Sequence, residues 1–225
     1  MATAWTVDQF CSVHVVKYRN FYKPLLKKYV FMKGKYTILD REYHHALTLI
    51  TKELSGRGID YCIIGGGAVQ IHVVSAAQDI EALRDRLRRT GDIDTIVNAP
   101  LEEMVLLFNE LTAQGVASNR GFGKAFIGGV SINYMPKGYL QGFSHEFAFG
   151  ETEYKDVRGT QVNVQAPEIC IAAKLTGSFQ LKDIQDIRLL HRELGGKLDE
   201  SKIRHALPQL GQEGKMDVYH GIIGD

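Results

Sequence analysis

The stretch YCIIGGGAVQIHVV, residues 61–74, is followed a short way along the chain by RRTGDIDTIV, residues 88–97. The first is an apolar run that ends in three glycines, and the second places two aspartates one residue apart in another apolar run. Residues two apart in a strand point to the same face, so Asp92 and Asp94 are predicted to project together. Because burying charge is costly, this pair requires a partner.

The two stretches together indicate a phosphate and metal site. Two close carboxylates repel unless a cation lies between them, and Mg²⁺ (or Mn²⁺) is a common choice when a phosphate completes its ligands. Gly65, Gly66 and Gly67 let the backbone turn tightly into a helix and approach a ligand closely. Backbone N–H groups at a helix N-terminus suit phosphate oxygens. We therefore predict a site for a nucleoside triphosphate (NTP) with its metal.

Two other phosphate-binding motifs are excluded. The run GGGAVQ lacks the G-x-G-x-x-G spacing of dinucleotide-binding folds. The run GFGK, residues 121–124, resembles a Walker loop, but Ser118 stands where its first glycine belongs and Ala125 follows the lysine. Taken alone, GDID is equally well explained as a turn acid followed by an edge-strand acid, and the upstream glycines favour the functional interpretation.

The composition is that of a globular protein. The 225 residues are 44% hydrophobic and 24% charged, which excludes disorder as the main account, and the net charge of +1 does not indicate a dedicated nucleic-acid binder. Cys11, Cys62 and Cys170 are too far apart for a disulfide framework or a CxxC metal site. No apolar stretch approaches the ~20 residues of a membrane span, and the N-terminus lacks the pattern of a secretory signal. We expect a soluble cytoplasmic protein with no membrane partner.

The order of apolar patterns predicts an α+β fold, in which a short mixed β-sheet has flanking helices and is followed by a C-terminal helical unit. Helices are expected in residues 40–58, from Ala68 onward, in 99–115, 166–178, 181–194 and 199–210, with a charged helix or ordered loop at 76–89. Strands are expected at residues 60–64, 92–97, 124–136 (as a hairpin or two adjoining strands), 145–150 and 160–165. The predicted domains are an N-terminal helical extension (1–40), an α/β core (41–165) and the C-terminal helical unit (166–225).

The N-terminal extension is rich in basic and aromatic residues. Residues 15–36, VVKYRNFYKPLLKKYVFMKGKY, interleave the two kinds of side chain. Such a stretch either contacts a polyanion such as RNA or forms an amphipathic helix that packs its aromatic rings on the body with lysines in solvent. The sequence leaves both possibilities open.

From these motifs the chain resembles the DNA polymerase β-type nucleotidyltransferase superfamily, in particular its minimal members, the AbiEii/MenT-type toxin and aminoglycoside nucleotidyltransferases. The resemblance rests on strand–Gly-Gly–helix followed by R-x-T-x-D-h-D, where h is an apolar residue. The matching residues are Gly66, Gly67, Arg88, Thr90, Asp92 and Asp94. A second block, residues 166–190, is similar to the family's Pro-led helix with a lysine followed by K-D-x-x-D-h. Its matching residues are Lys174, Lys182, Asp183 and Asp186.

The resemblance implies transfer of a nucleoside monophosphate from an NTP to an acceptor hydroxyl, with pyrophosphate leaving. It implies that Asp92 and Asp94 hold the metal and, with Lys174, form the catalytic set. The residues then expected to bind the nucleotide are Gly66, Gly67, Arg88, Thr90, Lys182 and Asp183. Alternatively, Lys174 is an ordinary exposed helix lysine, and Lys182 and Asp183 belong to a structural polar network.

The family's third carboxylate is not found in its usual place. The corresponding run is VSINYMP, where Ser131 and Asn133 occupy one strand face. Neither can act as a general base, although both can form hydrogen bonds. Glu146, Glu151 and Glu153 are candidates to supply the acid from a neighbouring strand.

Two functions from different classes therefore remain. One is a metal-dependent nucleotidyltransferase whose acceptor is a tRNA or other RNA end, a protein hydroxyl or a small molecule. The other is a non-catalytic nucleotide-binding or interaction protein that keeps the fold and the metal pair. Pyrophosphate release from labelled NTPs with Mg²⁺ distinguishes them.

Overall fold

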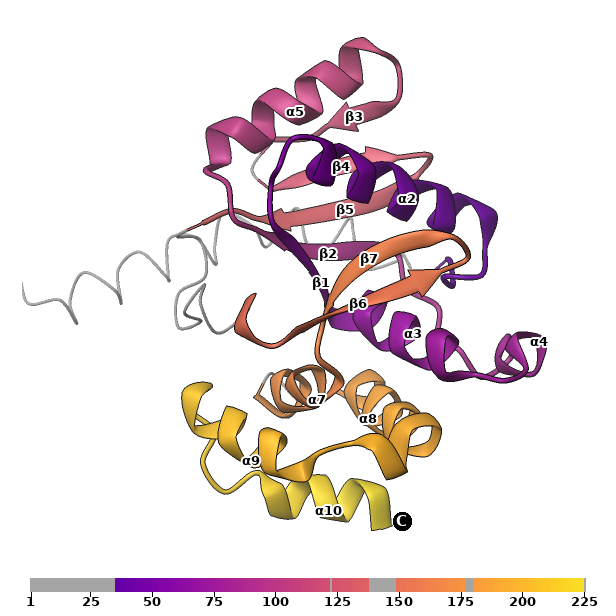
Figure 1. Ribbon diagram of the computed structural model, residues 1–225, viewed down its shortest axis with the longest axis vertical. Coiled ribbons are helices and arrows are strands. Elements are labelled where there is room, and N and C mark those ends of the chain that lie inside the picture. The colour runs from indigo at the N-terminus through magenta and orange to yellow at the C-terminus, as the bar shows by residue number, and fades with distance from the viewer. Residues whose placement is uncertain (1–34, 122, 138–148, 177–179, 225) are drawn as a thin grey trace, which may run out of the picture. The chain divides into compact units, whose positions relative to one another are not determined.

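The computed structural model describes residues 35–121, 123–137, 149–176 and 180–224 (Figure 1). They belong to one compact unit, Gly34–Asp225. Most of the predicted N-terminal extension, with Cys11 and nearly all of the basic stretch, lies outside the described residues. The predicted domain boundaries after residues 40 and 165 stay predictions.

The described residues form helices and strands in alternation along the first half and helices alone at the end. The helices are α2 (Arg41–Gly56), α3 (Gly65–Ala76), α4 (Ile80–Leu83), α5 (Leu101–Ala113), α7 (Pro167–Thr176), α8 (Leu181–Leu194), the 3₁₀ helix η1 (Gly195–Lys197), α9 (Glu200–Gln209) and α10 (Met216–Gly224). The strands are β1 (Tyr61–Ile64), β2 (Asp92–Val97), β3 (Ala117–Asn119), β4 (Lys124–Ile127), β5 (Val130–Met135), β6 (Thr152–Val157) and β7 (Thr160–Gln165).

The strands form one mixed sheet of seven, in the order β3-β4-β5-β2-β1-β7-β6. The two strands predicted to carry the site are neighbours, because β1 pairs antiparallel with β2. On their outer sides, β2 pairs parallel with β5 and β1 pairs parallel with β7. The predicted hairpin is formed by β4 and β5, which are antiparallel. The predicted α+β class is confirmed, and the sheet has more strands than the sequence patterns showed.

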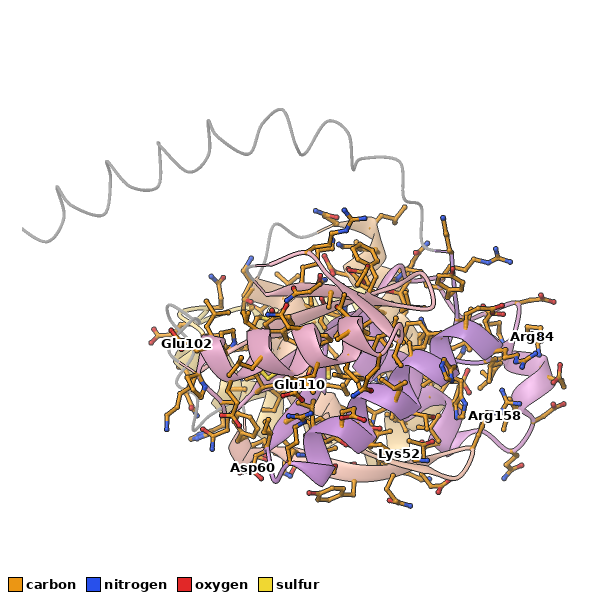
Figure 2. The ribbon with its side chains drawn as sticks, turned by 90° about the horizontal axis from the view of Figure 1, so that it is seen from above. Lys52, Asp60, Arg84, Glu102, Glu110 and Arg158 are labelled. Carbon is orange, nitrogen blue, oxygen red and sulfur yellow. The ribbon has the colours of Figure 1, made fainter. Side chains whose placement is uncertain are left out.

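The core lies between the sheet and the helices that cover it. On β5, Tyr134 is buried and stacks on Phe108 of α5, with 4.9 Å between the ring centroids. Since neighbouring strand residues point to opposite faces, α5 covers the face opposite to that of Asn133. The outer side of α5 is acidic, and Figure 2 shows Glu102 and Glu110 along it, both exposed.

The C-terminal helices α7, α8, α9 and α10 gather together beyond the strands, on the side of α3 (Figure 1). Both α7 and α8 contact α3, and α7 also packs on α9. The first turn of α3 therefore lies between the sheet and the C-terminal helices, which brings the two sequence blocks of the predicted site together. None of the helices in the described ranges combines the length and apolar composition needed to cross a bilayer.

Some elements differ from the predicted ones. Helix α3 begins at Gly65 and not at Ala68, so the three glycines form its first turn. Strand β6 was not predicted because TEYKDV lies at an edge of the sheet and shows no regular alternation of apolar residues. Strand β3 and helix α10 were also missed. The strand predicted at residues 145–150 falls mostly outside the described residues.

Candidate active site

Asp92 and Asp94 lie on the same face of β2, as the two-residue alternation predicts. Asp94 is opposite Ile64, the last residue of β1, and Asp92 extends beyond the end of β1. On the other side, Asp92 pairs with Ser131 and Asp94 with Asn133. The two carboxylates thus lie where β1 ends and α3 begins, which is the arrangement expected for a site at that turn.

The amide of Asn133 joins the two carboxylates. Its Nδ2 donates to Asp94 Oδ1 at 2.8 Å and to Asp92 Oδ2 at 3.2 Å, and its Oδ1 accepts from Ser131 Oγ at 3.2 Å. The hydroxyl of Thr90 donates to Asp92 Oδ1 at 2.9 Å. We call Asp92 and Asp94 the carboxylate pair, and the side-chain amide of Asn133 its bridge. All these partners are neutral donors, so they orient the carboxylates without balancing their charge.

The electrostatics of the carboxylate pair follow from this imbalance. Burial, followed by the negative charge of Asp92, raises the pKa of Asp94 to about 6. The hydrogen bond from Asn133 and the positive charges of Lys174 and Lys182 act in the opposite direction and are weaker. Asp94 therefore sits where its ionised form is disfavoured until a cation approaches.

The glycine turn is adapted to close packing against the predicted site residues. Gly65 has φ +66°, and a Cβ there would lie 2.8 Å from Asp94 Oδ2. A Cβ on Gly66 would lie within 2.5 Å of Arg88 Nη2. Gly65 is favoured by its backbone conformation as well as by the nearby carboxylate, whereas a side chain at Gly66 would require the Arg88 guanidinium to shift.

The first turn of α3 offers backbone donors. Its N-cap residue is Ile64, whose side chain cannot accept a hydrogen bond, so no side chain caps the N–H groups of this turn. The N-terminal end of a helix carries partial positive charge, which favours anions. This end lies beside the carboxylate pair, so a phosphate bound here would be close to a cation held by Asp92 and Asp94.

Four side chains from the two sequence blocks form a second polar group, which we call the ion cluster: Arg88, Lys174, Asp183 and Asp186. Arg88 donates to Asp186 from Nε at 3.0 Å and from Nη2 at 2.9 Å. Lys174 Nζ lies 2.6 Å from Asp186 Oδ2 and 3.5 Å from Asp183 Oδ1. The side chain of Asp186 is 3% exposed, so it is a buried anion between two cations.

The contacts of Lys174, Asp183 and Lys182 bear differently on the roles predicted for them. Lys174 is paired with two carboxylates and is 10% exposed, so the alternative of an ordinary exposed lysine is wrong. Asp183 lies 3.5 Å from Lys174 Nζ and forms a capping box with Gln180 at the start of α8, so it has structural partners in this arrangement. Lys182 is exposed, and its charge acts on Asp94, so it is a cation near the carboxylate pair.

The third carboxylate is not supplied by the candidates that the structure describes. Glu151 pairs with Lys202, and Glu153 lies on β6, which β7 and β1 separate from β2. Glu146 lies outside the described residues. Within the described ranges, no group of three or more His, Cys, Asp or Glu side chains is placed to hold a metal. Among the described residues, a metal here would be held by two carboxylates and would need further ligands.

Two further residues belong to the site region. The hydroxyl of Tyr43, on α2, donates to the backbone oxygen of Asp92 at 3.2 Å and lies against the glycine turn at Gly67. Burial raises its pKa, so it remains a donor. No sequence signal pointed to Tyr43, because an aromatic residue at a buried helix position carries no sign of a contact 49 residues away. Asp186 matched the family pattern, and its part in the ion cluster was not foreseen.

A cavity of about 320 Å³ adjoins the site. Gly65, Lys174 and Asp183 form part of its wall, and most of the rest is apolar, including Ile96 and Met135. Cys170 also lines it, and both described cysteines are buried, with burial raising the pKa of each thiol. The site therefore combines a charged end with an apolar space large enough for part of a ligand.

Solved structures of other proteins have a fold similar to this one. No protein-family model matches the chain, and no curated protein is significantly similar to it in sequence. Among solved structures, an antigenic nucleotidyltransferase-like protein from Paracoccidioides brasiliensis is similar over 82% of this chain and 97% of its own, with 16% identity and a TM-score of 0.52. The solution structure of the antibiotic-resistance factor ANT(2'')-Ia covers 79% of this chain and 97% of its own, with 18% identity and a TM-score of 0.48. The chain therefore has the nucleotidyltransferase-like fold that the sequence motifs led us to expect.

Proposed function

We propose that this chain binds an NTP with Mg²⁺ or Mn²⁺ and transfers the nucleotidyl group to an acceptor hydroxyl, with release of pyrophosphate. One observation carries the proposal: two carboxylates project from β2 beside the first turn of α3, where the N-cap side chain makes no hydrogen bond and Gly65 lies close against Asp94. A cation site and a phosphate site are therefore adjacent.

The residues present fit a divalent cation that arrives with phosphate. Carboxylate oxygens are the ligands that Mg²⁺ prefers, and Mg²⁺ is commonly held by one or two carboxylates together with substrate phosphates. Asp92 and Asp94 would hold the cation, which when bound would offset negative charge on the reacting phosphate. Thr90 keeps the Asp92 carboxylate oriented through its hydrogen bond.

The remaining residues of the chain would bind and position the nucleotide. The first-turn N–H groups at Gly66 and Gly67 are suited to phosphate oxygens. Lys182, exposed near Asp94, is the cation that we expect to meet the triphosphate directly. Arg88 and Lys174 are held by Asp186 in the ion cluster, so we expect them to fix α7 and α8 against the sheet and to add positive potential. Catalysis would rest on positioning and charge stabilisation.

Asn133 favours a second candidate, a nucleotide-binding protein without turnover. It stands where the family's third acid is expected and cannot accept a proton from an attacking hydroxyl. Under this candidate the nucleotide and metal bind, and no pyrophosphate appears with any acceptor.

Calorimetry with Mg²⁺ and non-hydrolysable analogues of each of the four NTPs tests the binding site. Asp92→Asn and Asp94→Asn should each weaken the affinity about tenfold or more, since each removes an anionic ligand. A conservative change at the surface, Glu102→Gln, should leave it unchanged. Unchanged affinity in both aspartate variants would contradict the site. Pyrophosphate release from each hydrolysable NTP, measured with acceptor RNA or with small hydroxyl compounds, then distinguishes the two candidate functions.

A further inference from the structure

The amide bridge of Asn133 occupies the position that a cation would take between the two carboxylates. One Nδ2 group reaches Asp94 at 2.8 Å and Asp92 at 3.2 Å. The orientation of the amide is fixed from behind by Ser131, whose Oγ donates to Asn133 Oδ1. One oxygen of each carboxylate is therefore already engaged by an N–H donor, on the side where the two carboxylates face each other.

The charges around the site also work against a free cation. Asp92 and Asp94 together carry two negative charges at most, and no third acidic ligand joins them among the described residues. The positive charges of Lys174 and Lys182 act on Asp94. A free divalent cation would have to give up water, displace the amide hydrogens and approach these lysines, in return for two carboxylates.

A cation that is already bound to an NTP meets different conditions. The phosphates supply several of its oxygen ligands, so two carboxylates are enough to complete the arrangement. The phosphates also bring negative charge toward Lys182 and the first turn of α3, which turns the unfavourable positive charges into favourable ones. The bridge would be displaced only when these contacts form together.

We propose that Asn133 makes the carboxylate pair selective for a divalent cation already complexed with a nucleoside triphosphate, and closed to the free cation. This inference rests on the proposed nucleotide site and adds to it the chemical form of the ligand. Asn133 is a specificity-determining residue in this account, because its N–H groups compete with a cation for the same two carboxylates.

Calorimetry of the full chain with Mn²⁺ alone, and with Mn²⁺ plus each non-hydrolysable NTP analogue, tests the inference. The wild type should bind the metal–nucleotide complex much more tightly than Mn²⁺ alone. Asn133→Asp adds an acid and removes the bridge, and should raise the affinity for free Mn²⁺ at least tenfold. Asn133→Leu removes the bridge without adding charge, and should also raise it, by about threefold or more.

The matched control is Asn98→Asp, which adds the same charge at an exposed position next to the other end of β2. It should leave the affinity for free Mn²⁺ unchanged, and thermal melting of each variant checks that it folds. Wild-type binding of free Mn²⁺ as tight as that of Asn133→Asp would overturn the inference and leave the proposed function standing. An increase in Asn133→Asp with none in Asn133→Leu would also overturn it, because charge and not the amide would then control access. Failure of the wild type to bind any metal–nucleotide complex would overturn the proposed function itself.

Discussion

The carboxylate pair and the ion cluster are two groups of buried or half-buried charges at the same junction of sheet and helices, and they are built differently. In the ion cluster, Arg88 and Lys174 face Asp183 and Asp186, so positive and negative charges are equal in number. In the carboxylate pair, Asp92 and Asp94 have neutral partners in Thr90 and Asn133. The charges of the first group balance one another, whereas the hydrogen-bonding partners of the second leave its negative charge uncompensated.

This difference separates structural from functional use of charge. A balanced group of buried charges adds little net stability, because the cost of removing both partners from water offsets much of their attraction. Removing one partner alone is nevertheless strongly destabilising, because it leaves the other charge buried and unpaired. An unbalanced group costs stability in the absence of its ligand, and this cost is the reason to regard it as a binding site. The next three changes test the contrast.

The largest effect is expected from Asp186→Ala. It leaves Arg88 and Lys174 without their shared carboxylate and should lower the free energy of unfolding by about 3 kcal/mol. The value lies at the low end of the range for buried pairs because 26% of the Arg88 side chain is exposed. Denaturant unfolding measures it. The control is Glu110→Ala, which removes the surface partner of Arg57 and should cost less than about 1 kcal/mol. Equal losses in the two variants would contradict a structural role for the ion cluster.

A substitution in the carboxylate pair is expected to raise the free energy of unfolding and not to lower it. Because the fold raises the pKa of Asp94 to about 6 from an ordinary 3.8, the fold favours the protonated carboxyl. That contribution to stability is complete below pH 3.8 and is lost as the pH rises through about 6. Asp94→Asn should therefore stabilise the metal-free protein by up to about 3 kcal/mol at pH 8, with almost no effect near pH 4.

Unfolding of wild type and Asp94→Asn in a chelating buffer across this pH range measures the effect. The same variant loses affinity for the metal–nucleotide complex, so stability and binding should change in opposite directions. A destabilised Asp94→Asn at pH 8, or a difference that does not depend on pH, would show that the pair is not strained.

The smallest effect concerns the glycine turn. Gly65 and Gly58 have similar φ angles, +66° and +68°, but a Cβ at Gly58 meets open space whereas one at Gly65 meets Asp94 Oδ2 at 2.8 Å. Gly58→Ala should cost about 1 kcal/mol through backbone strain alone, and Gly65→Ala about 1 kcal/mol more. The extra loss should disappear when Asp94 is also replaced by Ala, which a double-mutant cycle by denaturant unfolding measures. An extra loss that persists in the Asp94→Ala background would place its cause elsewhere.

Much of the fold followed from local patterns. Apolar runs of four to six residues bounded by glycine located β1, β2, β5 and β7, and helical spacing located α2, α5 and the helices up to α9. The predictions that failed also have physical reasons. An edge strand such as β6 needs no regular apolar face, and a glycine-rich first turn of a helix is hard to distinguish from a loop, so the start of α3 was placed three residues late.

By itself, the sequence determined that Asp92 and Asp94 share one strand face and that glycines follow β1 where the next helix begins, because both depend on neighbours within a few residues. It also indicated that Asn133 stands in place of an acid. Only the tertiary structure decided which charges are balanced. The pairing of Arg88 with Asp186 spans 98 residues, and the bridge from Asn133 to Asp94 spans 39. Such contacts depend on strand order and helix packing, which are set by the burial of the whole apolar core and not by the residues that meet.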